Sequence, residues 1–162
     1  VLEKISEKIN SSNLTDKNPA LKLAEYITSI PVIYYPFGLQ SAAIRFKNSL
    51  QENSKIHAMV ENIVETCHNG IVSWEKISNV QPILIQGADD FIRTKERWKI
   101  IKKYFENNKI EYFEITSISG SILSKIINLI YVLDYSSIYF AVMSKTDPTP
   151  VKSIEFIKSK LN

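Results

Sequence analysis

The stretch PVIYY, residues 31–35, decides how this chain of 162 residues folds. It is a run of β-branched and aromatic residues bounded by Pro31 and Pro36, which is typical of a β-strand. A second apolar run, PILIQ at residues 82–86, has the continuous hydrophobicity of strands that a parallel sheet buries on both faces. We therefore assign these two segments as central strands.

Further strands and helices alternate with these two segments. The runs KIHAMV at residues 55–60 and EYFEIT at residues 111–116 are expected to be strands. Helices are expected in residues 1–10, 19–29, 37–52 after a short loop, 61–68, 92–107, 119–143 and 150–161, the last with Thr149 as its N-cap. This order predicts an α/β fold, a three-layer α/β/α sandwich with a parallel sheet of about four or five strands, with binding sites at the carboxyl ends of the strands.

The composition fits one globular domain, since 44% of the residues are hydrophobic. Twenty basic residues against 17 acidic ones give a net charge of +3, and the lysines are scattered, so no nucleic-acid surface is expected. The single cysteine, Cys67, excludes an internal disulfide. The opening VLEKISEKIN does not resemble a signal peptide, and we expect a cytoplasmic protein.

The richest apolar run, residues 122–143, is long enough to span a membrane. Lys125, Asn128 and Asp134 interrupt it, as does the serine pair at residues 136–137, and each is costly in hydrocarbon. We therefore expect no membrane span, but a helix buried nearly all round and partly covered by another subunit.

Glu52 and His68 are candidates for acid–base chemistry. Glu52 shares a polar helix stripe with Arg45 and Asn48, although a solvated helix face explains this pattern at least as well. His68 is expected at a helix end, where the dipole favours an imidazolium, or where the residue simply caps the helix. Cys67 beside His68 raises a thiol hydrolase, but neighbours on a helix point about 100° apart, which argues against that pair.

Lys158 is the third candidate. It lies within the apolar stripe of the last expected helix, whose members are Val151, Ile154, Ile157 and Leu161. An ammonium on an inward face is costly unless it has an anionic partner or lines a wet cleft. Snorkelling at the end of a terminal helix remains the alternative.

Four blocks of sequence together resemble a known family. They are NPALKLAEYITSIPVIYY, RFKNSLQENSK, HNGIVSWE and LDYSSIYFAVMSKTDPTPVKSIEFIKSKL. In this order they resemble the C-terminal half of the bifunctional phosphoglucose/phosphomannose isomerases, in the phosphoglucose isomerase superfamily. The resemblance implies that residues 17–162 form a flavodoxin-like sugar isomerase (SIS) domain and that residues 1–16 connect it to a preceding SIS domain that this chain lacks.

The resemblance also implies a reaction, the conversion of glucose 6-phosphate or mannose 6-phosphate to fructose 6-phosphate through a cis-enediol. No cofactor and no metal is implied. Glu52, in the E-N-x-K block, would be the base that moves a proton between C1 and C2. His68, in the H-N block, would assist ring opening from the partner subunit of a homodimer. Lys158 would serve ring opening and stabilise the enediol.

The sequence departs from the family around His68. Gly70 stands where the family has Glu, His57 where it has Pro, and residues 64–67 replace a P-E-L-N block. The phosphate cradle and an arginine of the family's site belong to the absent domain, so we expect this chain alone to have little activity. Two alternatives remain open: a non-catalytic module that binds a sugar phosphate as a sensor, and a chain whose long helix serves only oligomerisation.

Overall fold

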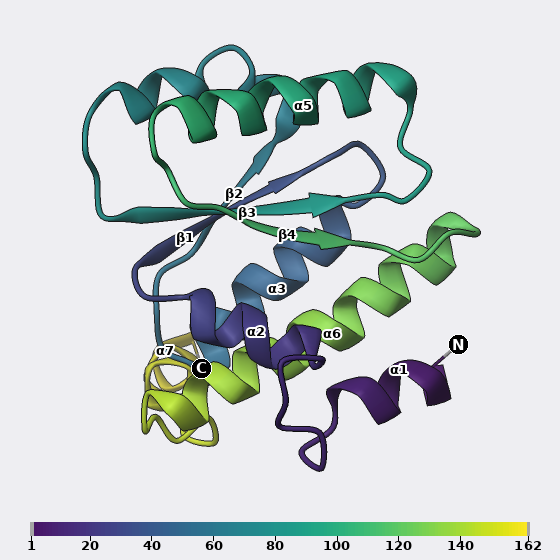
Figure 1. The fold of residues 1–162 in the computed structure, drawn as a ribbon. Helices are drawn as coiled ribbons and strands as arrows, with labels where there is room; N and C mark the ends of the chain where they lie inside the picture. The colour runs from purple at the N-terminus through teal and green to yellow at the C-terminus, as the bar shows by residue number, and fades with distance from the viewer. Residues whose placement is uncertain (1, 162) are drawn as a thin grey trace.

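A parallel sheet of four strands lies at the centre of the protein, seen in Figure 1 as a computed structural model that describes residues 2–161. The strands are β1 (Ile30–Tyr35), β2 (Met59–Asn62), β3 (Val80–Gln86) and β4 (Phe113–Thr116). Their order is β2-β1-β3-β4, and each neighbouring pair is parallel. With helices on both faces, this confirms the predicted three-layer α/β/α sandwich, and the strand order is the flavodoxin-like one.

The strands β1 and β3 form the middle of the sheet because both are apolar. Residues 32–35 of β1 and 83–85 of β3 are all buried, as expected for strands covered on both faces. They lie side by side with Ile33 opposite Ile83. The two stretches predicted to be central strands are therefore confirmed.

Helices cover the two faces of the sheet unequally (Figure 1). One face carries α2 (Pro19–Tyr26), α3 (Gln40–Asn53) and α6 (Ile122–Met143), with α1 (Leu2–Ile9) packed against α6 and α2. The other face carries α4 (Ile63–Thr66), the 3-10 helix η1 (Gly70–Glu75) and α5 (Ile92–Asn107). The last helix, α7 (Lys152–Leu161), lies beside the end of α3.

Each face has its own apolar core. On α5, Trp98, Ile101 and Phe105 recur at helical spacing and are buried against one face of the sheet. The core on the opposite face joins α2, α3 and α6, and Ile9 at the end of α1 is fully buried in it. That residues 1–16 connect two domains stays a prediction.

The long apolar helix α6 meets the length and composition of a membrane span, but it packs by one face onto α1, α2 and α3. Two of its polar residues contact α3: Ser49 donates a hydrogen bond to Asp134 Oδ1 over 2.6 Å, and Asn53 donates one to Ser137 Oγ over 2.8 Å. Within residues 2–161 this helix is not buried nearly all round, because α6 is an outer layer of the sandwich, and its cover by another subunit stays a prediction. Its exposed apolar residues are Ile122, Leu123, Ile127, Ile138, Val142 and Met143.

Several element boundaries differ from those predicted; for example, α2 ends at Tyr26 and not at residue 29, and α6 begins at Ile122 and not at residue 119. The strand expected at residues 55–60 begins only at Met59 and continues to Asn62, whose side chain accepts the Val64 N–H over 2.9 Å and so starts α4 as a single turn. The last helix begins at Lys152, two residues later than expected. Asp147 accepts the backbone N–H of Thr149 over 2.9 Å, and this turn delays the helix.

Candidate active site

Glu52 lies in the last turn of α3, on the face that points away from the core. Phe46 and Leu50 on the same helix are fully buried against the sheet, which leaves Glu52 exposed. The helix starts after the carboxyl end of β1 and leads to the beginning of β2, so its last turn lies at the amino edge of the sheet. This is the edge opposite to the one at which we expected a binding site.

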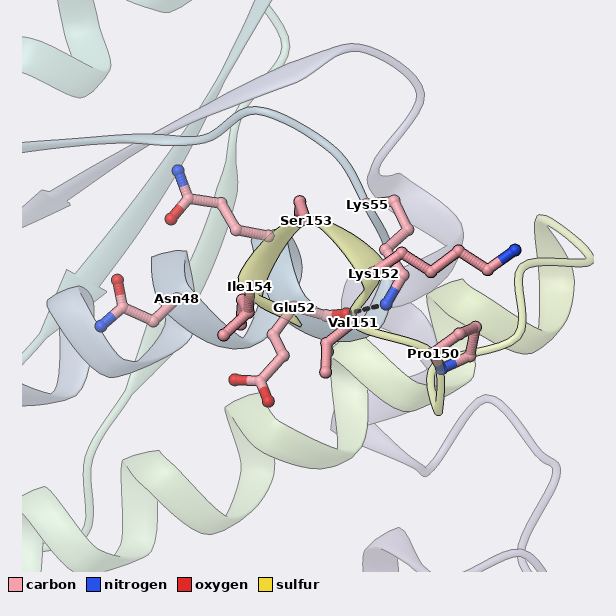
Figure 2. A pocket seen from close by; sticks show the side chains of 9 residues that line it. Asn48, Glu52, Lys55, Pro150, Val151, Lys152, Ser153 and Ile154 are labelled. Atoms are coloured by element: carbon pink, nitrogen blue, oxygen red, sulfur yellow. Dashed lines mark hydrogen bonds between the residues drawn. The ribbon is translucent and has the colours of Figure 1, made fainter. Parts of the chain in front are cut away.

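A cavity of about 580 Å³ separates the end of α3 from the start of α7 (Figure 2). Its lining residues are Asn48, Gln51, Glu52, Lys55, Pro150, Val151, Lys152, Ser153 and Ile154. The cavity thus holds one carboxylate, two ammonium groups and two side-chain amides. Such a set of groups can accept and donate hydrogen bonds to a polyhydroxylated anion.

Lys55 joins the two walls of this cavity. Its ammonium donates hydrogen bonds to the backbone carbonyl of Glu52 (Figure 2) and, over 3.3 Å, to that of Pro148. Its backbone φ is 58°, in the left-handed region that terminates many helices and usually favours glycine. The conformation just after α3 therefore aims this side chain at the turn that precedes α7.

The polar stripe that carries Glu52 is not uniformly solvated. Arg45 pairs with Asp134 of α6 over 3.0 Å, and this hydrogen-bonded carboxylate raises the pKa of the guanidinium. Asn48 and Glu52 instead line the cavity. The stripe therefore has two halves, one that fastens α3 to α6 and one that faces the cavity.

Lys158 is exposed on α7, and the expectation of an inward-facing lysine is wrong for this chain. No described residue of α7 is buried: Ile157 is 57% exposed and Leu161 is 79% exposed, because nothing within residues 2–161 covers their stripe. Ile154 lines the cavity, and Lys158 lies one turn further along the same face of the helix. Lys158 therefore lies on the same face of α7 as Ile154, one turn beyond the cavity that Glu52 lines.

His68 is not brought near Glu52. It follows α4 at the carboxyl end of β2, on the face of the sheet that α5 covers, and its side chain is exposed. Its backbone N–H donates to the Glu65 carbonyl over 3.0 Å. Because α4 is one turn long, it lacks the helix dipole that we expected to act on the imidazole.

A second cavity, of about 610 Å³, lies beside β2 and was not found from the sequence. The cavity is lined by Glu61, and burial raises the pKa of this carboxyl. A hydrogen bond from the Thr66 hydroxyl offsets part of that rise. A Cβ at Gly70 would lie 2.3 Å from Oε2 of Glu61. The carboxylate of Glu61 therefore occupies the space beside position 70.

Aromatic groups form another wall of this second cavity. Trp74 Nε1 donates a hydrogen bond to the hydroxyl of Tyr34 over 2.9 Å, and burial raises the pKa of Tyr34 to about 12. Nearby, desolvation raises the pKa of the Cys67 thiol, which makes it a poor nucleophile. Among residues 2–161, no three His, Cys, Asp or Glu side chains are grouped so that they could hold a metal ion.

Comparisons with known proteins agree on one group. Residues 16–161 match the family model described as the bacterial phospho-glucose isomerase C-terminal SIS domain. The chain is 32% identical to a bifunctional phosphoglucose/phosphomannose isomerase of Caldicellulosiruptor bescii, over 99% of this chain and 49% of that protein. It is 30% identical to the protein of the same name from Aquifex aeolicus, over 98% of this chain and 50% of that protein.

The fold has solved relatives as well. A glucose-6-phosphate isomerase-like protein from Thermus thermophilus matches 90% of this chain and 50% of its own, with a TM-score of 0.72 and 13% identity. At that identity the likeness concerns the fold alone. The chain spans about half the length of the curated relatives that it matches.

Proposed function

Since the chain belongs to the bacterial phosphoglucose isomerase C-terminal SIS domain family, we propose that it is the base-carrying half of an aldose–ketose isomerase acting on hexose 6-phosphates. The substrates would be glucose 6-phosphate and mannose 6-phosphate, both converted to fructose 6-phosphate. The observation that carries this proposal is the cavity in which Glu52 faces the start of α7.

The proton transfer assigns a task to each group. The Glu52 carboxylate takes the proton from C2 of the open-chain aldose while O1 gains a proton, which gives the cis-enediol. The same carboxyl then returns its proton to C1, and O2 loses one to become the carbonyl of the ketose. The ammonium of Lys158 stabilises negative charge on the enediol oxygens, and no covalent bond to the protein is needed.

His68 would act in a second copy of the chain. Ring opening needs an acid beside the ring oxygen, whereas within one chain His68 and Glu52 lie on different faces of the sheet. A homodimer in which His68 reaches the cavity of its partner satisfies this need. The phosphate group would be held by an N-terminal SIS domain outside this chain, which accords with a match to half of each relative.

The test compares turnover of fructose 6-phosphate to glucose 6-phosphate by these 162 residues and by the full-length product of the gene. We expect turnover by the longer product only, because the isolated half lacks the phosphate anchor that positions the substrate. Robust turnover by the 162 residues would contradict the division of the site between two halves. Absence of turnover from both would contradict the isomerase and favour the sugar-phosphate sensor.

A further inference from the structure

We infer that Lys55 is a positioning residue that fixes α7 over Glu52. The catalytic part of this inference rests on the proposed isomerase, whereas the mechanical part concerns this chain alone. It starts from the contrast between α3, which is anchored in the core by Phe46 and Leu50, and α7, in which no described residue is buried. The placement of α7 must therefore depend on the turn that precedes it.

The turn at residues 147–150 meets α3 through Lys55. Among residues 2–161, the hydrogen bond that joins the end of α3 to this turn runs from Lys55 Nζ to the Pro148 carbonyl over 3.3 Å. The same ammonium lies close to Asp147. The pKa of Asp147 is lowered chiefly by the Thr149 N–H, and the charge of Lys55 adds to that effect.

The other hydrogen bond of Lys55 holds the ammonium in place. It goes to the backbone carbonyl of Glu52, one of the last carbonyls of α3, where a cation is favoured by the helix dipole. The Lys55 side chain thus bonds the backbone of Glu52, as Figure 2 shows, and also the turn that precedes α7. Loss of this link should free α7, and with it Lys158, from a fixed position relative to Glu52.

Lys55 follows α3 in the left-handed region, as Lys109 and Lys145 follow α5 and α6, so the side-chain bonds and not the conformation distinguish it. A φ of 58° costs a lysine more than a glycine, so glycine would be the simpler residue to end α3. The preceding residue, Ser54, already satisfies the helix end through its N–H to the Leu50 carbonyl. The helix end thus does not need Lys55 as a cap, and what the lysine adds is the side-chain hydrogen bond from the end of α3 to the Pro148 carbonyl.

Hydrogen–deuterium exchange on this chain tests the link without any assay of activity. In Lys55→Met, the amides of residues 147–161 should exchange about three- to tenfold faster than in the unchanged chain, because a charge-assisted hydrogen bond is lost. Lys55→Arg, which keeps the charge and the donors, should restore slow exchange. Lys47→Met, on the same helix two turns earlier, is the matched control and should leave this segment unchanged.

Lys55→Gly separates the backbone from the side chain. It relieves the left-handed conformation, so its thermal midpoint should equal or exceed that of the unchanged chain while residues 147–161 still exchange faster. Exchange in this segment that is unchanged in both Lys55→Met and Lys55→Gly would overturn the inference. In the full-length product, Lys55→Met should lower kcat about tenfold and leave KM nearly unchanged. The reason is that a displaced α7 no longer stabilises the transition state, whereas substrate binding is largely kept.

The two hypotheses can fail separately. If the full-length product shows no isomerase activity, the proposed function fails, and the exchange experiment still decides whether Lys55 holds α7. If the product is active and Lys55→Met leaves kcat unchanged, the isomerase stands and Lys55 has no positioning role in it.

Discussion

Glu52 and His68 lie at opposite ends of strand β2. Glu52 lies in the last turn of α3, before the strand begins, and His68 follows the single turn of α4 that comes after the strand. They also belong to different layers, since α3 packs on one face of the sheet and α4 on the other. Sixteen residues thus separate two groups that the proposed reaction needs together, and a second copy of the chain is the simplest way to join them.

Mixing two inactive variants of the full-length product tests this arrangement. Glu52→Gln and His68→Ala homodimers should each be inactive, but a heterodimer would contain one site with both residues intact. After random exchange of subunits, about a quarter of the unmutated activity should return. A mixture that stays inactive, despite heterodimers detected by mass spectrometry, would mean that both groups act within one chain.

Removal of α7 should separate folding from function. Among the described residues 150–161 no side chain is buried, so a chain that ends at Thr149 should lose less than about 1 kcal/mol of its free energy of unfolding. The full-length product cut at the same residue should lose its turnover, because Lys158 and one wall of the Glu52 cavity are removed. Urea unfolding and the fructose 6-phosphate assay measure the two effects, and a large loss of stability would show that α7 belongs to the core.

The carboxyl of Glu61 should make stability depend on pH. Its folded pKa is raised by burial above the ordinary value of 4.5, so the folded state holds this proton more tightly than the unfolded state. Its contribution is present in full below pH 4.5 and is lost as the pH rises through the folded pKa. Glu61→Gln should therefore stabilise the chain more at pH 7 than at pH 4, as measured by urea unfolding at both values.

An exposed acid on α1 provides the control for that experiment. Glu7→Gln removes the same charge there, whereas Glu65 would not serve, because its charge helps to raise the pKa of Glu61. Glu7→Gln should alter the free energy of unfolding by a similar small amount at both pH values. If Glu61→Gln behaves in the same way, the Glu61 carboxyl is not desolvated in the folded chain.

The central strands and α5 could be predicted from the sequence because burial shapes their composition directly. Residues 82–86 lie within β3, and the bounds of α5 agree with the prediction at both ends. The starts of α4 and α7 could not be found in this way. Single side-chain contacts set them, namely the Asn62 cap and the Asp147 turn, which leave no trace in a hydrophobic pattern.

The candidate site was predictable by residue type and not by arrangement. The sequence pattern placed Glu52 on a polar stripe and Lys158 on an apolar one. The prediction of an inward-facing lysine holds only if other residues of the same chain bury that apolar stripe. In α7 that condition is not met, as the exposure of Ile157 and Leu161 shows. The approach of Glu61 to Gly70 joins a strand to a turn, so neither residue alone predicts it.

The measurement that tests the central claim most directly is proton transfer by Glu52→Gln in the full-length product. Fructose 6-phosphate would be incubated in heavy water, and both its turnover and the deuterium at C2 of the glucose 6-phosphate formed would be followed by NMR. Because Glu52 is exposed, the substitution should leave the fold and the thermal midpoint unchanged. We predict that turnover and deuterium incorporation both fall about a thousandfold, whereas values within about tenfold of the unmutated protein would contradict the assignment of Glu52 as the base.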